Sequence, residues 1–360
     1  MLSADFRATI APLDQGAAAA ARARIDQLTK PLGSLGRIEE LAVQLAAIAG
    51  GQPEHNYERR TILIGAGDHG VASEGVSAYP PEVTAQMVGG FLAGFAAINT
   101  FARAVRAEVY VANFGVREPL GSHPRLLDVN VGYGTANLAV RPAIKRDDLE
   151  YNLAAGVAAF DEVREKAPFD VLALGEMGIG NTTSASAIVA AFTGKAPATV
   201  VGRGTGVDDE RLQRKIAVVE RALTRIQDFT WDEIASEVGG FEIVGLSGVI
   251  LSAARARVPI VLDGFIVAAA ALIAGAIAPQ ALGYCIAAHR SQEPGHVAAL
   301  ESLGLRPLFD LELRLGEASG AALALPMIEA AARMIREMHT FAQAGVATKE
   351  EGAAALEVTH

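Results

Sequence analysis

Short apolar runs alternate with longer stretches of helical periodicity through the middle of the chain. The runs have the length and β-branched content of buried strands, and they lie at 61–65, 109–112, 126–131, 171–174, 198–202, 259–262 and 284–288. Helical stretches separate most of them, at 82–103, 147–166, 183–192, 208–226 and 245–257. This alternation predicts an α/β fold in which a mostly parallel, doubly wound (Rossmann-like) sheet carries helices on both faces.

The start of the chain lacks this alternation. Residues 16–28 are rich in alanine and 38–48 place branched apolar side chains at helical spacing, so both segments are predicted to be helices. The segment 30–37 between them, KPLGSLGR, is rich in proline and glycine and has a basic residue at each end. It is either a helix connector or a basic loop close to an acidic substrate.

One segment requires a test for a membrane span. Residues 264–288 carry no charge, and this segment is long enough to cross a bilayer. Glycine and proline at 264, 275, 279 and 283 interrupt the segment, however, and alanine is its commonest residue. We therefore expect a buried helix over 265–277, a turn at 279–280 and then a strand, with no membrane partner.

Charge and cysteine content narrow the possible partners and the compartment. The 360 residues carry a formal net charge of −10, which disfavours nucleic acid and anionic membranes as partners. The single cysteine, Cys285, excludes an intramolecular disulfide and fits a reducing compartment. No signal peptide is visible in residues 1–10, which contain Asp5 and Arg7. We expect a cytoplasmic protein.

A strand-to-helix corner within 170–190 holds the most informative pattern in the chain. Glycines at 175, 178 and 180 let the backbone approach a ligand, and Asn181 and Thr182 are residue types that begin helices. Free N–H groups at a helix start suit phosphate, whereas the carboxylate of Glu176 points to a sugar hydroxyl. The Walker and dinucleotide spacings are absent, so a phosphate site and a plain tight turn are both open.

Polar clusters follow other predicted strands. Gly202–Gly206 precedes a helix that contains Lys215, Asp263 follows the run 259–262, and Ser291–His296 follows the last run. If the strands are parallel, these loops converge at one edge of the sheet, where ligands bind in such folds.

A metal site is the first alternative for this edge. Carboxylates and imidazoles that could be imagined as ligands occur at Asp68, His69, Asp263, His289 and His296. The HExxH motif and other paired-ligand spacings are absent, so we expect no catalytic metal.

Glu317 is a single carboxylate at the predicted start of a helix, among apolar neighbours. The helix dipole favours its ionised form, while burial would raise its proton affinity. That balance suits a general base working near neutral pH. The alternative is an ordinary acidic residue in a first helical turn.

Six segments match one family in the same order: KPLGSLGRIEELA (30–42), GDHGV (67–71), GEMGIGNTT (175–183), VGGFE (238–242), LDGF (262–265) and RLGEASGAALALP (314–326). Over nearly its whole length the chain resembles the nicotinate-nucleotide:dimethylbenzimidazole phosphoribosyltransferases. The resemblance implies transfer of the phosphoribosyl group from nicotinate mononucleotide to 5,6-dimethylbenzimidazole. The products are α-ribazole 5′-phosphate, the lower-ligand nucleotide of cobalamin, and nicotinate. The pyridinium is already a cationic leaving group, so no cofactor and no metal are implied.

The resemblance also implies roles for individual residues. Glu317 would be the base, and Glu176 would contact the ribose or the leaving group. Phosphate and ribose would be held by Met177, Gly178, Ile179, Gly180, Asn181, Thr182, Gly204, Lys215 and Asp263. Met177 and Leu315 would face the aromatic base.

The acceptor slot departs from some relatives. Where they have a serine and a glutamine near the bound base, this chain has Tyr79 and Met87, with Gln86 one position earlier. A somewhat different base is therefore an alternative acceptor, and relatives include some that accept purines or phenols.

The family's architecture implies a large α/β domain at 58–300, a small helical domain built from 1–57 and 301–360, and a homodimer. Two other classes of function are open from the residues. A nucleotide-binding oxidoreductase would need an intact dinucleotide fingerprint, which neither glycine loop supplies. A non-catalytic nucleotide sensor would keep the phosphate loop but would not need Glu317.

Overall fold

The computed structural model describes residues 2–54 and 56–347. The chain divides into two compact units. The larger unit comprises Met1–Pro12 and Arg59–Leu325, and the smaller one comprises Leu13–Glu58 and Pro326–His360. Segments near both ends of the chain thus contribute to the smaller unit, while residues 2–12 and 301–325 belong to the larger one.

The centre of the larger unit is a parallel sheet, as predicted. Within the described residues it has six strands in the order β3-β2-β1-β4-β5-β6. They are β1 (Arg60–Gly67), β2 (Ala107–Gly115), β3 (Leu126–Asp128), β4 (Val171–Met177), β5 (Ile260–Leu262) and β6 (Cys285–Ala287). The strand order reverses between β1 and β4, and ligands of doubly wound folds bind at such a reversal.

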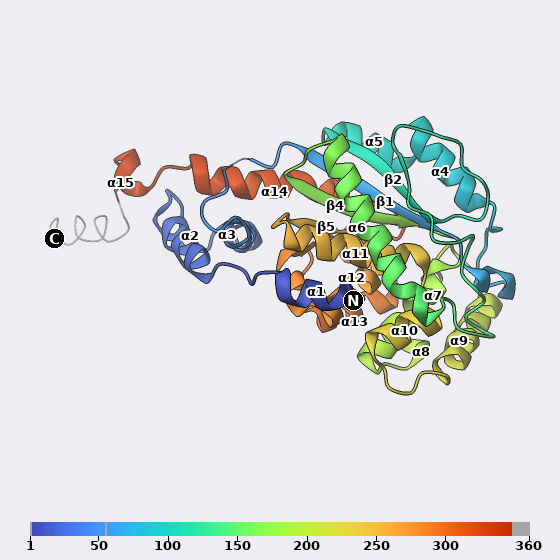
Figure 1. The fold of residues 1–360 in the computed structure, drawn as a ribbon. Coiled ribbons are helices and arrows are strands. Elements are labelled where there is room, and N and C mark those ends of the chain that lie inside the picture. The colour runs from blue at the N-terminus through green and yellow to red at the C-terminus, as the bar shows by residue number, and fades with distance from the viewer. Residues whose placement is uncertain (1, 55, 348–360) are drawn as a thin grey trace. The chain divides into compact units, whose positions relative to one another are not determined.

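Helices cover both faces of this sheet (Figure 1). On one face, α4 (Val83–Ala93) packs against β1, β2 and β4, and α5 (Ala97–Ala104) packs against β2. On the other, α6 (Leu149–Lys166) and α11 (Phe241–Arg255) pack against each other and the sheet, with α12 (Phe265–Ile277) beside α11. Strand β1 is buried along its whole length, which explains its continuous apolar run.

The remaining elements of the larger unit are shorter or lie around the sheet edge. They are α1 (Leu2–Thr9), η1 (Gly70–Glu74), η2 (Arg146–Asp148), α7 (Asn181–Thr193), α8 (Pro197–Val200), α9 (Asp209–Leu223), α10 (Trp231–Val238), η3 (Pro279–Tyr284) and α13 (Pro294–Leu303). Helix α14 (Ser319–Glu337) begins in the larger unit, and the division between the units falls within it.

Two sequence predictions about these elements were wrong. The run 198–202 is not a strand, because Pro197 occupies the first turn of α8, where its fixed φ favours a helix. The helix predicted over 82–103 is divided into α4 and α5, because Gly94 has a left-handed φ of 85° and ends α4.

That division also bears on membrane insertion. Among the described residues, the helical stretch Val83–Ala104 is long and apolar enough to cross a bilayer by length and composition. The break at Gly94 leaves α4 with 11 residues, a rise of about 16 Å against a hydrocarbon core of about 30 Å. The charge-free segment after Gly264 forms the buried helix α12, then η3 and β6, as predicted. Both stretches are core helices and not membrane spans.

The smaller unit is helical. It contains α2 (Gln15–Gln27), α3 (Arg37–Ala49), the second part of α14 and α15 (Phe341–Ala344). Helix α2 packs against α3, and Arg24 donates a hydrogen bond to the carbonyl oxygen of Ile335 in α14. In the connector 30–37, Lys30 forms a buried ion pair with Glu39 at 2.9 Å.

Candidate active site

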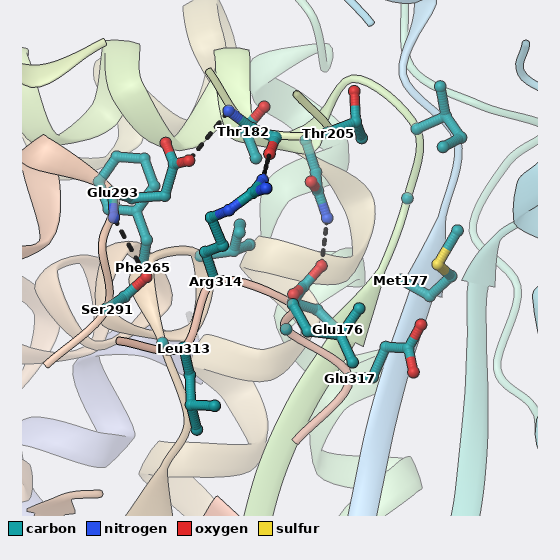
Figure 2. A pocket seen from close by; sticks show the side chains of 18 of the residues that line it. Glu176, Met177, Thr182, Thr205, Phe265, Ser291, Glu293, Leu313, Arg314 and Glu317 are labelled. Carbon is teal, nitrogen blue, oxygen red and sulfur yellow. Dashed lines mark hydrogen bonds between the residues drawn. The ribbon is translucent and has the colours of Figure 1, made fainter. Parts of the chain in front are cut away.

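A cavity of about 720 Å³ lies in the larger unit, at the edge of the sheet where the sequence places the converging loops (Figure 2). Its walls come from the end of β4, the start of α7, the start of α12 and loops that follow β6 and precede α14. The lining residues are Tyr79, Val83, Met87, Glu176, Met177, Gly178, Ile179, Asn181, Thr182, Gly204, Thr205, Gly264, Phe265, Ile266, His289, Ser291, Glu293, Glu312, Leu313, Arg314, Leu315, Gly316 and Glu317.

Most of the site residues predicted from the sequence line this cavity. Four of them do not: Gly180, Lys215, Asp263 and Gln86. Lys215 and Asp263 are buried behind residues of the wall, and Gln86 is exposed on α4.

Glu176 lies near the end of β4 with its side chain in the wall. The carboxylate accepts a hydrogen bond from the side-chain amide of Asn181. Burial raises the pKa of Glu176 to about 8; the Asn181 hydrogen bond opposes this shift, and the charges of Asp263, Glu242 and Glu317 add to it. At neutral pH Glu176 is therefore mainly protonated, so it can donate one hydrogen bond.

The glycine loop before α7 packs tightly on the end of β1. A Cβ atom on Gly178 would lie 2.2 Å from the carbonyl oxygen of Gly67, so only glycine fits there. Gly180 has a left-handed φ of 97°, and the backbone N–H of Ile179 donates to the Thr84 hydroxyl. This packing brings Asn181 and Thr182, the first residues of α7, to the cavity wall.

Lys215 approaches the same wall from behind. Its ammonium group donates to the hydroxyl oxygen of Thr182 at 2.8 Å and to the carbonyl oxygen of Gly202 at 3.0 Å. Burial lowers the pKa of Lys215 to about 8, against the charge of Glu293. Glu293 in turn accepts the backbone N–H of Gly204 at 2.9 Å.

Glu317 precedes α14 and has 7% of its surface exposed. Burial raises the pKa of its carboxyl group to about 7. Glu317 and the preceding Gly316 both have positive φ angles, of 59° and 85°. Figure 2 shows Glu317 close to Glu176 and Met177, on one side of the cavity.

Part of the cavity wall is apolar. It contains Met177 and Leu315, together with Tyr79 and Met87. Sequence reasoning did not select Phe265 and three further apolar residues, which are Val83, Ile266 and Leu313.

Several polar lining residues were also missed. Arg314 is the one lysine or arginine among the described residues that line the cavity, and it donates to the carbonyl oxygen of Gly204 at 3.4 Å. Ser291 and Glu293 follow β6, in a loop that the sequence marks only as polar. The sequence indicates only that this loop lies at the sheet edge where the loops converge. It does not indicate which of its side chains enter the cavity.

The described residues contain no group of three or more His, Cys, Asp or Glu side chains placed to hold a metal ion. His69 contacts Glu242, with 2.7 Å between Nε2 and Oε1. His289 and His296 are buried, and burial lowers their pKa values to about 4 and about 3. Both imidazoles are therefore neutral at physiological pH.

Comparisons with known proteins match almost the whole chain to a single family. A family model described as a phosphoribosyltransferase matches residues 10–346. The nicotinate-nucleotide–dimethylbenzimidazole phosphoribosyltransferase of Chloroflexus aggregans is 52% identical over 344 residues, 95% of this chain and 97% of the relative. The protein of that name from Roseiflexus sp. strain RS-1 is 53% identical over 346 residues, 96% of this chain and 98% of the relative.

The fold agrees equally well with a solved structure. The crystal structure of CobT from Thermus thermophilus superposes with a TM-score of 0.89 at 50% identity, covering 92% of this chain and 99% of that one. With half of its residues identical to relatives that it covers end to end, the chain belongs to the nicotinate-nucleotide–dimethylbenzimidazole phosphoribosyltransferase family.

Proposed function

We propose that this protein transfers the 5-phosphoribosyl group of nicotinate mononucleotide to 5,6-dimethylbenzimidazole, giving α-ribazole 5′-phosphate and nicotinate for cobalamin synthesis. Near-complete similarity to enzymes of that name supports the reaction. The structural observation that carries it is Glu317, a carboxylate with a pKa near 7 beside an apolar wall. That wall suits a flat base, and the carboxylate suits removal of its N–H proton.

The proposed chemistry needs one base. One nitrogen of the benzimidazole attacks C1′ of the ribose from the face opposite the pyridinium, while Glu317 takes the proton from the other nitrogen. The bond from C1′ to the pyridinium nitrogen breaks, and its electron pair neutralises the ring, so nicotinate leaves. General-base catalysis typically contributes about 10²–10⁴-fold, and holding the two substrates in line supplies a large further part.

The rest of the site would hold the nucleotide. In our assignment the 5′-phosphate lies at the start of α7, against Thr182 and Gly204, with the charge of Lys215 behind them. Arg314 adds a second cation at this wall. Glu176, protonated at neutral pH, would donate a hydrogen bond to the ribose.

The acceptor is the finer part of the proposal. Tyr79 and Met87 line the slot, so an acceptor other than 5,6-dimethylbenzimidazole is the second candidate; adenine, benzimidazole and phenol are the ones to test. We also propose a homodimer in the cytoplasm. Large apolar side chains on the surface, including Leu32 and Phe95, support association, and the buried free thiol of Cys285 fits a reducing compartment. Light scattering of the purified protein tests the dimer.

The test of function is a chromatographic assay with nicotinate mononucleotide and each of the four acceptors. Wild-type protein should form α-ribazole 5′-phosphate, and Glu317→Gln should lose more than about tenfold in kcat. Glu312→Gln is the matched control, because Glu312 is a carboxylate on the same loop and in the same cavity but exposed. It should keep kcat within about threefold.

Each other outcome of this assay has a definite meaning. Nicotinate release with only another acceptor keeps the mechanism and changes the substrate. If no acceptor leads to nicotinate release, the proposed enzymatic function is wrong. Calorimetry with nicotinate mononucleotide then tests whether the protein is a nucleotide sensor. A sensor would bind equally well with glutamine at position 317.

A further inference from the structure

Glu317 lies in the middle of a left-handed turn. Gly316, Glu317 and Ala318 have consecutive φ angles of 85°, 59° and 64°. Glycine adopts this conformation freely, but Glu317 and Ala318 do so only when the surrounding structure holds them there. The direction of the Glu317 side chain therefore depends on the groups that fix this turn.

Strand β4 fixes the turn from one side. A Cβ atom on Gly175 would lie 2.2 Å from the backbone nitrogen of Ala318, and one on Gly316 would lie 2.3 Å from Oε1 of Glu176. The backbone of the turn is thus in direct contact with β4 at Gly175, which leaves no room for a side chain there, and Gly316 packs against the carboxyl group of Glu176.

Asp263 fixes the start of α14, directly after the turn. It follows β5, is 2% exposed, and accepts the backbone N–H of Ala321 at 2.9 Å. Ala321 lies in the first turn of α14, three residues after the end of the left-handed turn. Asp263 therefore holds the start of the helix that directly follows the left-handed turn, and an acceptor at a helix start is favourable.

The far side of Asp263 is closed. Nδ1 of His289 lies 3.9 Å from Oδ1 of Asp263, and Gly320 packs so closely on His289 that a Cβ atom there would lie 2.0 Å from Nδ1. The Asp263 carboxylate is enclosed between this imidazole and the first turn of α14. It does not line the cavity.

We propose that Asp263 is a positioning residue, whose carboxylate holds the turn at residues 316–318 and thereby directs the Glu317 carboxylate at the acceptor base. This inference rests on the proposed role of Glu317 as the base. It differs from the sequence-based expectation that Asp263 contacts the phosphate or ribose, because such a contact would support nucleotide binding and this one supports proton removal.

The first variant is Asp263→Asn, which keeps the side-chain size and replaces the carboxyl group with an amide. We expect kcat to fall at least tenfold, with the KM for nicotinate mononucleotide within about threefold of wild type. Asp170→Asn is the matched control. Asp170 is a similarly buried aspartate at the opposite end of β4, where it pairs with Arg59, and its loss should lower Tm without changing kcat.

A double-mutant cycle then separates positioning from a general loss of structure. In the Glu317→Gln background, Asp263→Asn should change kcat by less than twofold, because the group that it positions is already absent. An equal loss of kcat in both backgrounds overturns the inference, and so does a loss confined to KM. If Asp263→Asn does not fold, Asp263→Glu keeps the charge and adds one methylene group; unchanged kcat in that variant overturns the inference.

The same data distinguish failure of the inference from failure of the proposed function. An inactive wild type contradicts the function, and full activity of Glu317→Gln contradicts the base and the inference together. Loss of activity in Glu317→Gln with independent effects of the two substitutions overturns only the positioning role of Asp263.

Discussion

The ammonium group of Lys215 lies directly behind the hydroxyl group of Thr182, to which it donates a hydrogen bond at 2.8 Å. Because the Thr182 oxygen accepts this bond, its own hydrogen is turned elsewhere, and Thr182 lines the cavity. The hydroxyl group is thus a donor available to an anion, with a buried positive charge behind it. In the proposed assignment, Thr182 binds the phosphate and Lys215 supports it from outside the wall.

This arrangement predicts a KM for nicotinate mononucleotide that depends on pH. Burial lowers the pKa of Lys215 to about 8, so the ammonium group loses its proton and its charge as the pH rises through that value. We expect KM to rise by roughly tenfold between pH 7 and pH 9, equivalent to about 1.4 kcal/mol of binding. Initial rates from pH 6.5 to 9.5 measure it. Lys215→Met should have a high KM at every pH, and a flat wild-type profile would contradict the assignment.

Glu176 predicts an effect on stability that depends on pH. Burial raises its folded-state pKa to about 8, above its value of 4.5 in the unfolded chain. The stability that the neutral carboxyl group provides is present below pH 4.5 and is lost as the pH rises through about 8. Glu176→Gln keeps a neutral acceptor for Asn181, so its Tm relative to wild type should rise with pH.

At pH 9 we expect a variant Tm a few degrees above wild type, since roughly 2–4 °C corresponds to each kcal/mol in a large domain. At pH 5.5 the two proteins should be closer. Differential scanning calorimetry at both pH values makes the comparison, and a Tm difference independent of pH would show that Glu176 titrates normally. The variant should also lose activity, because Glu176 is then a functional residue that lowers the stability of the wild-type protein.

The fold was largely predictable because its signals are local. Strands β1 and β4 are buried on both faces and appear in the sequence as unbroken apolar runs. The run 198–202 has the same composition, but Pro197 starts a helix there, so the composition of a short run did not decide its conformation. Gly94 divides a long helical pattern that periodicity alone extends to residue 103.

Residues of the candidate site could be predicted only where a short local sequence pattern marks them. The glycine corner around Glu176 and the isolated carboxylate of Glu317 are visible as short patterns, and both line the cavity. Arg314 and Glu293 are ordinary charged residues in sequence, and they enter the wall through contacts with Gly204, more than eighty residues away. Such contacts depend on tertiary structure and leave no periodic signal.

Arg314 predicts an effect on nucleotide binding. It is the one lysine or arginine among the described residues that line the cavity, and it lies beside Gly204 at the proposed phosphate wall. Arg314→Met should raise the KM for nicotinate mononucleotide about tenfold or more, with kcat within about threefold, because a charged hydrogen bond contributes roughly 1.5–3 kcal/mol. Arg290→Met is the control, since Arg290 is an exposed arginine outside the cavity wall. Equal KM values for the two variants would remove Arg314 from the phosphate site.

Gly175 predicts the most direct link between packing and catalysis. A Cβ atom there would lie 2.2 Å from the backbone nitrogen of Ala318, so Gly175→Ala must displace the turn that carries Glu317. Overpacking of this kind typically costs about 1–3 kcal/mol, and we expect kcat to fall further than the loss of stability alone explains. Urea unfolding and steady-state rates on the same preparation measure both effects.

Gly89→Ala is the matched control for that substitution. Gly89 lies within α4, is exposed, and has nothing within 4 Å of an added Cβ atom. Alanine should stabilise the helix by roughly 0.5–1 kcal/mol without changing kcat. If Gly175→Ala behaved like Gly89→Ala, the turn at 316–318 would have to move without consequence, and the geometry of Glu317 would not be what limits the rate.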